Sequence, residues 1–177
     1  GNFGDAVMNP ETPDIIDYFV SHNPNLRIDI STNGSARTKK FWQRLAGKAN
    51  VQFCLDGLED THSLYRINTN WNKIIENAKT FIDAGGKARW DMIVFKHNEH
   101  QVDECKKLAY QLGFKTFLLV KTDRDSGYVY DRNGKLIYTI GTVLEIANRS
   151  EPVSWQEQIE WSTINFVNKA HYSDPVK

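Results

Sequence analysis

The chain has 177 residues, 40% hydrophobic and 12% aromatic, which is enough apolar material to bury one sizeable core. Its 22 Lys and Arg are matched by 22 Asp and Glu, which excludes the basic field that attracts nucleic acid or anionic membranes. With no long apolar run or leader, and only Cys54 and Cys105, we expect a soluble, cytoplasmic protein without a disulfide framework or a CxxC metal site.

The first half of the chain alternates helical and strand periods, which predicts βα units feeding a parallel sheet. A helix is expected to begin at Thr12–Pro13, with Thr12 as its cap and Pro13 in its first turn. Strands are expected at 26–31 and 51–56, with a helix around 41–46 between them. The buried stripe predicted for the first helix consists of Ile15, Ile16, Phe19 and Val20.

The same alternation continues to residue 121. A helix is predicted after Asn70 and stops at Gly85–Gly86, and a strand follows at 88–96. Residues 98–101 resemble a capping box that opens another helix, which ends at Gly113 before a strand at 115–121. The predicted total is four helices and four strands, and the buried face of the helix after Asn70 is predicted to include Trp71, Ile74, Ile75, Ala78 and Ile82.

Beyond Asp123 the pattern changes. Residues 128–138 predict a β-hairpin around the Asn133–Gly134 turn. Ser154 and Glu157 form a second capping box, which predicts a helix to about His171. We therefore expect a core at residues 1–123 and an extension at 124–177 that holds the hairpin and the helix.

Polar residues alternate with apolar ones along the predicted strands. Parallel strands covered on both faces are usually apolar throughout, so one face of this sheet is expected to meet water and a ligand. The expected fold is α/β: a partial (β/α) barrel fragment of TIM-barrel type with an open, polar lumen. The alternative is an antiparallel α+β sheet with one solvated face. The alternating polar residues are Arg27, Asp29 and Ser31, then Gln52, Cys54 and Asp56, then Arg89 and Asp91.

Three segments at predicted strand ends carry a resemblance to a known family. The opening Gly1-Asn-Phe-Gly4-Asp5 resembles the Gly-Gly-Glu-Pro motif of the radical SAM superfamily, and Ser31-Thr32-Asn33-Gly34 is similar to its Thr-Asn-Gly turn. Cys54-Leu55-Asp56-Gly57, followed by His62 and Arg66, looks like its Ser-Ile-Asp-Gly strand end and His-x-x-x-Arg sequel. The resemblance covers residues 1 to about 123 and implies strands three to six of a six-stranded barrel.

The resemblance also implies roles for single residues around S-adenosylmethionine. Gly4 and Asp5 would bind its amino group, because glycine allows close backbone approach and a carboxylate pairs with an ammonium. Arg66 would bind its carboxylate through a planar fork. The adjoining wall would be formed by Thr32, Asn33, Cys54 and Asp56. Cys54 stands where the family has Ser, and Ala6 where it often has Pro.

The family's [4Fe-4S] cluster is held by a Cys-x-x-x-Cys-x-x-Cys loop before these strands, and this chain has no such loop. The expected function is that of a fragment of a radical SAM enzyme. It would bind S-adenosylmethionine and, with a missing N-terminal cluster segment, generate a 5′-deoxyadenosyl radical that abstracts hydrogen from an unknown peptide or small molecule. The alternative is a non-catalytic module that binds a nucleotide or another small ligand.

Other features have competing interpretations. His97, Glu99, His100 and Glu104 could share a cation, or they could line a solvated helix start. Lys96 and Lys121, at strand ends, could meet an anion or only water. Trp155 and Trp161 could face another segment or pack in the core.

Overall fold

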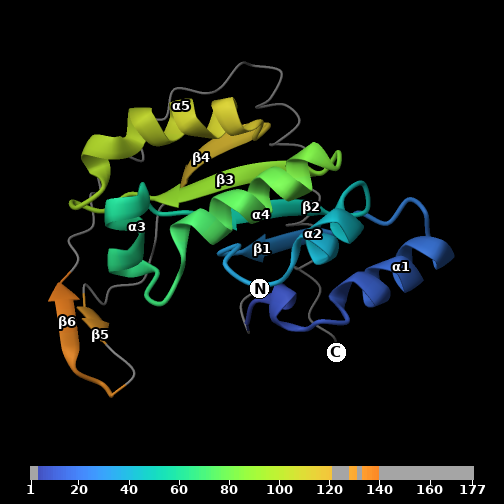
Figure 1. Ribbon diagram of the computed structural model, residues 1–177, viewed down its shortest axis with the longest axis horizontal. Helices are drawn as coiled ribbons and strands as arrows, with labels where there is room; N and C mark the ends of the chain where they lie inside the picture. Colours follow the sequence, from blue (N-terminus) through green and yellow to red (C-terminus); the bar gives the residue numbers. More distant parts are fainter. Residues whose placement is uncertain (1–3, 121–127, 131–132, 140–177) are drawn as a thin grey trace, which may run out of the picture. The chain divides into compact units, whose positions relative to one another are not determined.

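A computed structural model of the chain describes residues 4–120, 128–130 and 133–139. Its central sheet has the strand order β1-β2-β3-β4, and every neighbouring pair is parallel (Figure 1). The strands are β1 (Asp29–Thr32), β2 (Asn50–Cys54), β3 (Lys87–Ile93) and β4 (Thr116–Val120). The predicted βα units are thereby confirmed, and for these strands the antiparallel alternative is wrong.

Helices connect the strands, as parallel neighbours require. Figure 1 shows α2, α4 and α5 along one face of the sheet, where each helix connects two neighbouring strands. The seven-residue α3 was not predicted. The helices are α1 (Thr12–His22), α2 (Lys39–Leu45), α3 (Glu59–Tyr65), α4 (Trp71–Asp83) and α5 (Val102–Leu112), and the 3₁₀ turns are η1 (Ala6–Met8) and η2 (Glu99–Gln101).

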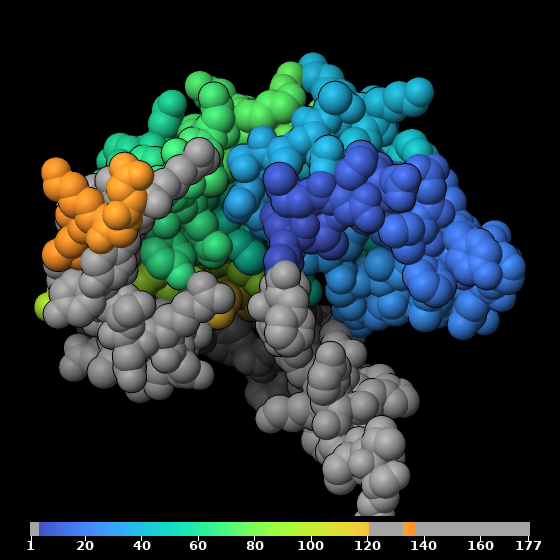
Figure 2. All heavy atoms as spheres, turned by 90° about the horizontal axis from the view of Figure 1, so that it is seen from below, coloured from blue at the N-terminus to red at the C-terminus, as the bar shows by residue number. Residues whose placement is uncertain are grey.

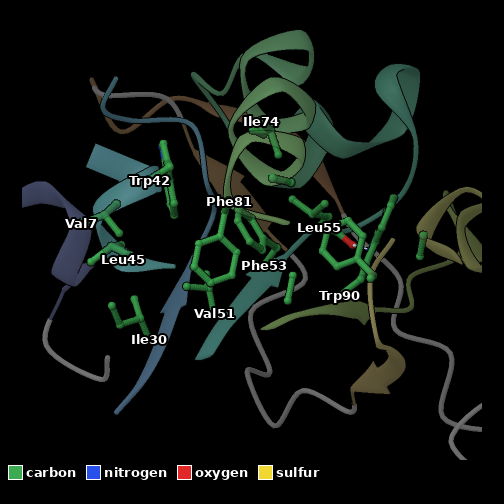
Figure 3. Packing of buried hydrophobic residues seen from close by; sticks show 14 of the residues in the cluster. Val7, Ile30, Trp42, Leu45, Val51, Phe53, Leu55, Ile74, Phe81 and Trp90 are labelled. Atoms are coloured by element: carbon green, nitrogen blue, oxygen red, sulfur yellow. Dashed lines mark hydrogen bonds between the residues drawn. The ribbon is translucent and has the colours of Figure 1, made fainter. Parts of the chain in front are cut away.

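The core lies between this face of the sheet and the helices (Figure 3). Phe53 of β2 is at its centre, with ring centroids 5.4 Å from Trp42, 6.2 Å from Phe81 and 5.7 Å from Phe114. Trp90 of β3 extends this aromatic cluster, and its ring centroid is 5.5 Å from that of Phe114. Such contacts add to the hydrophobic free energy of burying large rings, so this cluster fixes the sheet against α2 and α4.

The helix α4 begins and ends as its sequence predicts. The Asn70 side chain accepts a hydrogen bond from the backbone N–H of Lys73 at 2.9 Å, which is an N-cap. Gly85 follows the helix with φ +90°, in the left-handed region. Ile74 and Ala78 are fully buried as expected, and Phe81 is a buried member of the face that was not predicted.

The predicted burial of α1 is wrong in part. Ile16 is buried, but Ile15 is 43% and Phe19 48% exposed. Asp17 pairs with Arg44 of α2 at 2.8 Å and with Lys48 at 2.5 Å, and these contacts orient the helix with Ile15 and Phe19 outward. The predicted Thr12 cap is also wrong, because its hydroxyl donates to the backbone carbonyl of Ala6 at 2.6 Å.

Some element ends differ from the prediction. β1 begins at Asp29 instead of Leu26, and β3 ends at Ile93 instead of Lys96. The expected capping box at 98–101 is not formed, because Asn98 and Gln101 bind other parts of the chain. The side chains that could have capped this helix instead form hydrogen bonds with other parts of the fold, because a buried polar group is stabilised by the partner that the fold places nearest.

The face of the sheet opposite the helices is polar, as its alternating pattern predicts. Ser31 donates to Gln52 at 2.8 Å across the β1–β2 pair. In the next strand the Arg89 guanidinium forms a two-point ion pair with the Asp91 carboxylate. The residue Asp91 is the register partner of Cys54 on β2. These residues are half-buried, and the polar side chains of this face form hydrogen bonds and ion pairs with one another.

A two-stranded antiparallel sheet of β5 (Tyr128–Tyr130) and β6 (Leu136–Thr139) confirms the predicted hairpin. Gly134 has φ +77°, as a tight Asn-Gly turn requires. The described residues fall within one unit of the chain, Gly1–Ala147. The structure does not describe the predicted helix from Ser154 to His171, or the residues Trp155, Trp161 and Lys121. The division at residue 123 stays a prediction.

Candidate functional site at the carboxyl edge of the sheet

The N-terminal segment lies against the end of β1. Figure 2 shows η1 and α1, in dark blue, beside the lighter blue region of β1 and α2. Arg37 donates to the backbone carbonyls of Val7 and Met8, which fastens this segment to the loop before α2. The sequence neighbours Gly4 and Asp5 therefore come to lie at the carboxyl end of a strand that follows them by more than 20 residues.

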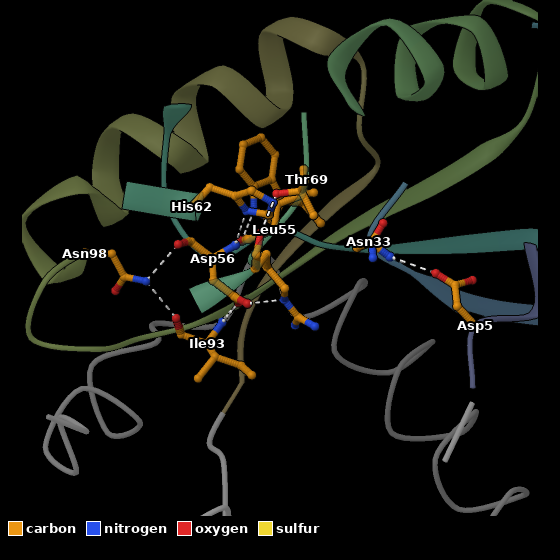
Figure 4. A network of polar contacts seen from close by, with 10 residues as sticks. Asp5, Asn33, Leu55, Asp56, His62, Thr69, Ile93 and Asn98 are labelled. Atoms are coloured by element: carbon orange, nitrogen blue, oxygen red, sulfur yellow. Dashed lines mark hydrogen bonds and ion pairs between the residues drawn. The ribbon is translucent and has the colours of Figure 1, made fainter. Parts of the chain in front are cut away.

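Asp5 is the most connected residue of this segment. One carboxylate oxygen accepts from the N–H of Val7 at 3.1 Å, and the other from the Thr32 hydroxyl at 2.7 Å. The second oxygen also accepts from the Asn33 N–H at 3.4 Å (Figure 4). Two carboxylate oxygens offer about four acceptor positions, so one remains for a further donor such as an ammonium. Asp5 is half-buried and can be reached by a ligand.

Thr32 and Asn33 hold the turn beside Asp5. Thr32 is buried, with 3% of the residue exposed. Its hydroxyl also accepts from the Gly34 N–H at 3.0 Å, so both of its hydrogen bonds are to other residues of the chain. The Asn33 side-chain oxygen accepts from the N–H of Ser35 at 2.9 Å, closing a local turn. Gly34 has φ +74°, and a Cβ there would lie 2.8 Å from the Phe53 ring, so this turn depends on glycine.

One strand further along, the end of β2 carries the second half of the site. Asp56 is fully buried, and one of its oxygens accepts from Arg66 Nε at 2.6 Å. Its other oxygen accepts from the Ile93 N–H at 2.7 Å, at the end of β3 (Figure 4). Arg66 follows α3, and its side chain is 24% exposed. Among the residues that the structure describes, its two Nη atoms have no hydrogen-bond partner.

Burial and neighbouring charges have opposing effects on the pKa values of the groups at this end of β2. Burial raises the pKa of the Asp56 carboxyl, while Arg66 and the Ile93 N–H act against that shift. Burial has the largest single effect on Arg66 and would lower its pKa, but the charge and hydrogen bond of Asp56, together with Cys54 and Tyr65, raise that pKa above its ordinary value. Burial also raises the pKa of the half-buried Cys54 thiol, which therefore stays protonated at neutral pH. The site presents one guanidinium and a neutral thiol.

His62 is a part of the site for which sequence analysis gave no separate role. It is 1% exposed, and its Nδ1 accepts from the Asp56 backbone N–H at 3.1 Å. The neutral ring therefore carries its proton on Nε2, which has no hydrogen-bond partner in the described part of the chain. The ring lies 5.6 Å from the Trp71 ring. Burial, assisted by the Arg66 charge, lowers the pKa of His62 to about 4.

This pKa predicts a loss of stability in mild acid. The unfolded chain protonates His62 near the ordinary value of 6.5, and the folded chain only near 4, so below pH 6.5 the unfolded state binds more protons. The free energy of unfolding should fall by about 3 kcal/mol between pH 6.5 and 4 through this residue alone. Urea unfolding of the chain and of His62→Asn across this range measures it. An equally steep decline in both proteins would contradict the assignment.

Both halves of the site lie on one edge of the sheet. Thr32 and Phe53 are paired in register, so Asn33 and the Cys54–Asp56 segment leave adjacent parallel strands at the same end. Ligand sites of α/β proteins lie outside this carboxyl edge. Counting only partners within residues 4–120, 128–130 and 133–139, the edge presents a carboxylate with one open position at Asp5 and an open guanidinium fork at Arg66. Such a pair of charges suits a ligand that carries both an ammonium and a carboxylate.

The residues present do not fit an iron-sulfur cluster. Cys54 is on β2 and Cys105 is buried in α5, and the whole sequence has no third cysteine. Within residues 4–120 and the hairpin, no three His, Cys, Asp or Glu side chains converge on a cation position. The cation alternative for His97, Glu99, His100 and Glu104 thus has no support in the geometry, and Lys96 is exposed.

The chain matches no family model and no curated protein sequence. Solved structures do share its fold. SuiB of Streptococcus suis, on its own and bound to S-adenosylmethionine, gives a TM-score of 0.61 at 15% identity over 94% of this chain. SuiB bound to its precursor peptide SuiA gives 0.62. Native anSMEcpe with bound AdoMet gives 0.52 at 18% identity over 68% of this chain.

These likenesses are of fold. The chain spans only 35% of SuiB and 36% of anSMEcpe, so it corresponds to about a third of each. The shared architecture is a partial (β/α) barrel, which confirms the fold class expected from sequence. In the described residues no helix is both long and apolar enough to cross a bilayer.

Proposed function

We propose that this chain is the part of a radical SAM enzyme that binds the amino-acid end of S-adenosylmethionine. Asp5 would accept the ammonium group, Arg66 would bind the carboxylate, and Gly4, Thr32, Asn33, Cys54 and Asp56 would form or support the adjoining wall. The reaction class proposed for the complete enzyme is hydrogen abstraction by a 5′-deoxyadenosyl radical. This chain would supply the S-adenosylmethionine site, and the cluster cysteines would be supplied by residues other than these 177.

The observation that carries the proposal is the open guanidinium fork of Arg66 on the same sheet edge as Asp5. An arginine whose Nε is engaged by a buried carboxylate still has the Nη donors that match a second carboxylate. The fold likeness to SuiB bound to S-adenosylmethionine and to anSMEcpe with bound AdoMet supports the same ligand. SuiB bound to a precursor peptide supports a peptide as the substrate class.

Titration of the chain with S-adenosylmethionine tests this function. We expect Arg66→Ala to weaken binding by about tenfold or more, because a charged hydrogen-bond pair contributes roughly 1.5–3 kcal/mol. Asp5→Asn should weaken it by a similar factor. Isothermal titration calorimetry gives both values. Arg44→Ala is the matched control, since Arg44 is an ion-paired arginine on α2, and it should bind like the parent chain.

A different result would point to the alternative function. If ATP binds as tightly as S-adenosylmethionine, and if Arg66→Ala changes neither affinity, the chain is better described as a nucleotide-binding module. Unchanged affinity in both Asp5→Asn and Arg66→Ala would remove the proposed amino-acid site altogether.

A further inference from the structure

Asp56 lies at the site but offers no surface to a ligand. Its residue is 0% exposed, and each carboxylate oxygen already accepts a hydrogen bond, from Arg66 Nε at 2.6 Å and from the Ile93 N–H at 2.7 Å. Because the residue is fully buried, this carboxylate cannot touch a bound molecule unless the site rearranges. Its effect on a ligand must therefore pass through a neighbour.

The backbone of Asp56 is fixed as firmly as its side chain. Its N–H donates to His62 Nδ1 at 3.1 Å, and its carbonyl accepts from Asn98 Nδ2 at 3.1 Å. The same Asn98 amide group donates to the Ile93 carbonyl at 3.0 Å (Figure 4). Its oxygen accepts from the Phe95 N–H at 2.8 Å. Asn98 thus joins the ends of β2 and β3, and Asp56 has little freedom to move.

Arg66 receives its orientation from this anchor. A guanidinium has five N–H donors in one plane, and the contact through Nε sets the direction of that plane. The Tyr65 ring, with its centroid 5.0 Å from Arg66 Cζ, borders the group on another side. The four remaining N–H donors, on Nη1 and Nη2, form the end of the fork that is left for a second acceptor.

We infer that Asp56 is a positioning residue, which holds the Arg66 guanidinium in the direction that receives the carboxylate of an α-amino-acid ligand. This inference rests on the proposed function and deepens it, because it gives Asp56 a role other than ligand contact. The benefit is preorganisation: a long arginine side chain held in one rotamer loses less freedom when the ligand binds. His62 and Asn98 support the arrangement through the Asp56 backbone.

Asp56→Asn separates positioning from simple charge. Asn can accept from Arg66 or from the Ile93 N–H through its one oxygen, so one of the two anchors is lost. The substitution also leaves Arg66 without its counter-ion, and that extra positive charge should strengthen binding of an anionic group. If Asp56 only neutralises Arg66, the variant binds S-adenosylmethionine more tightly. If Asp56 positions Arg66, the variant binds it more weakly.

The experiment measures two ligands, S-adenosylmethionine and decarboxylated S-adenosylmethionine, which lacks the group that Arg66 receives. We expect Asp56→Asn to weaken binding of the first by about fivefold or more and to leave the second within about twofold. In an Arg66→Ala background, Asp56→Asn should have no further effect on either ligand, because a positioning residue acts only through its partner. Asp91→Asn, which breaks the Asp91–Arg89 pair on this face, is the matched control and should keep the preference for the carboxylate.

The two possible failures can be told apart. Equal affinity of the parent chain for both ligands, or a preference that survives Arg66→Ala, would overturn the proposed function. A preference that depends on Arg66 but persists in full in Asp56→Asn would overturn only the positioning role. Equal loss of both ligands in Asp56→Asn would also overturn it, because that result indicates a disrupted site.

A measurement on the parent chain covers the case in which Asp56→Asn does not fold. The Arg66 Nε–H resonance in ¹⁵N NMR should exchange slowly with solvent in the free chain and stay in place when S-adenosylmethionine is added, while the Nη resonances shift. Fast exchange of Nε–H, or its displacement by the ligand, would contradict the inference.

Discussion

Replacing Gly57 with alanine should destabilise the folded chain by about 4 kcal/mol, since two costs act together. Gly57 has φ +116°, a conformation that residues with a Cβ rarely adopt. A Cβ built there lies 2.0 Å from the Thr61 Oγ1 and 3.1 Å from Gln101 Oε1. Neither neighbour can withdraw cheaply, because Thr61 donates to Gln101 and Gln101 Oε1 also accepts from the Leu58 N–H at 3.0 Å.

Chemical unfolding of Gly57→Ala and of two reference variants separates these costs. Gly47 also has a positive φ, +75°, but nothing lies within 4 Å of a Cβ there, so Gly47→Ala should lose only about 1 kcal/mol. Gly57→Ala combined with Thr61→Ala should recover part of the loss. If Gly57→Ala costs no more than Gly47→Ala, the close packing of α3 against η2 is wrong.

Replacing Trp90 with alanine should cost about 4 kcal/mol, the usual penalty for removing a fully buried indole ring. Trp90 is 0% exposed in the middle of β3 and lies between the rings of Phe114 and Phe117, at 5.5 and 5.9 Å. Its Nε1–H also donates to the Leu55 carbonyl at 2.8 Å, directly before Asp56. Trp90 therefore stabilises the core and the β2 end at once.

Trp90→Phe isolates the hydrogen bond from the packing. Phenylalanine keeps most of the buried ring but leaves the Leu55 carbonyl without its donor, at a cost of about 1–2 kcal/mol. Urea unfolding gives the two free energies. The affinity for S-adenosylmethionine should fall in Trp90→Phe as well, if the Leu55 carbonyl helps to hold Asp56. A Trp90→Phe variant as unstable as Trp90→Ala would contradict this division of the two effects.

Local signals in the sequence were reliable where their partners are also local. The Asn70 cap reaches only to Lys73, and the left-handed stop at Gly113, with φ +91°, depends on its own backbone. The Asn133–Gly134 turn is equally local. The alternation of polar and apolar residues correctly predicted which strand face packs against helices, because period 2 follows from strand geometry alone. The side of β2 and β3 that faces the helices could therefore be predicted from the sequence alone.

The candidate site could be predicted as a set of residues but not as an arrangement. Short motifs indicated that Asp5, Asp56 and Arg66 matter, and parallel topology implied a common sheet edge. Nothing local indicated that Asp56 would be wholly buried, or that its second oxygen would accept from Ile93, 37 residues away. His62 had no signal apart from its place in the motif, since its lowered pKa arises from burial that tertiary structure creates.

The sequence by itself determined the alternation of helices and strands, apart from α3, and the parallel sheet, because these depend on periodicity and on short-range backbone preferences. The tertiary structure decided which polar atoms meet. Asn98 and Gln101 could have capped a helix, yet they bind the Asp56 carbonyl and the Leu58 N–H, 42 and 43 residues away. A buried polar atom needs a partner wherever the chain supplies one, and contacts over such separations exist only after the layers have packed.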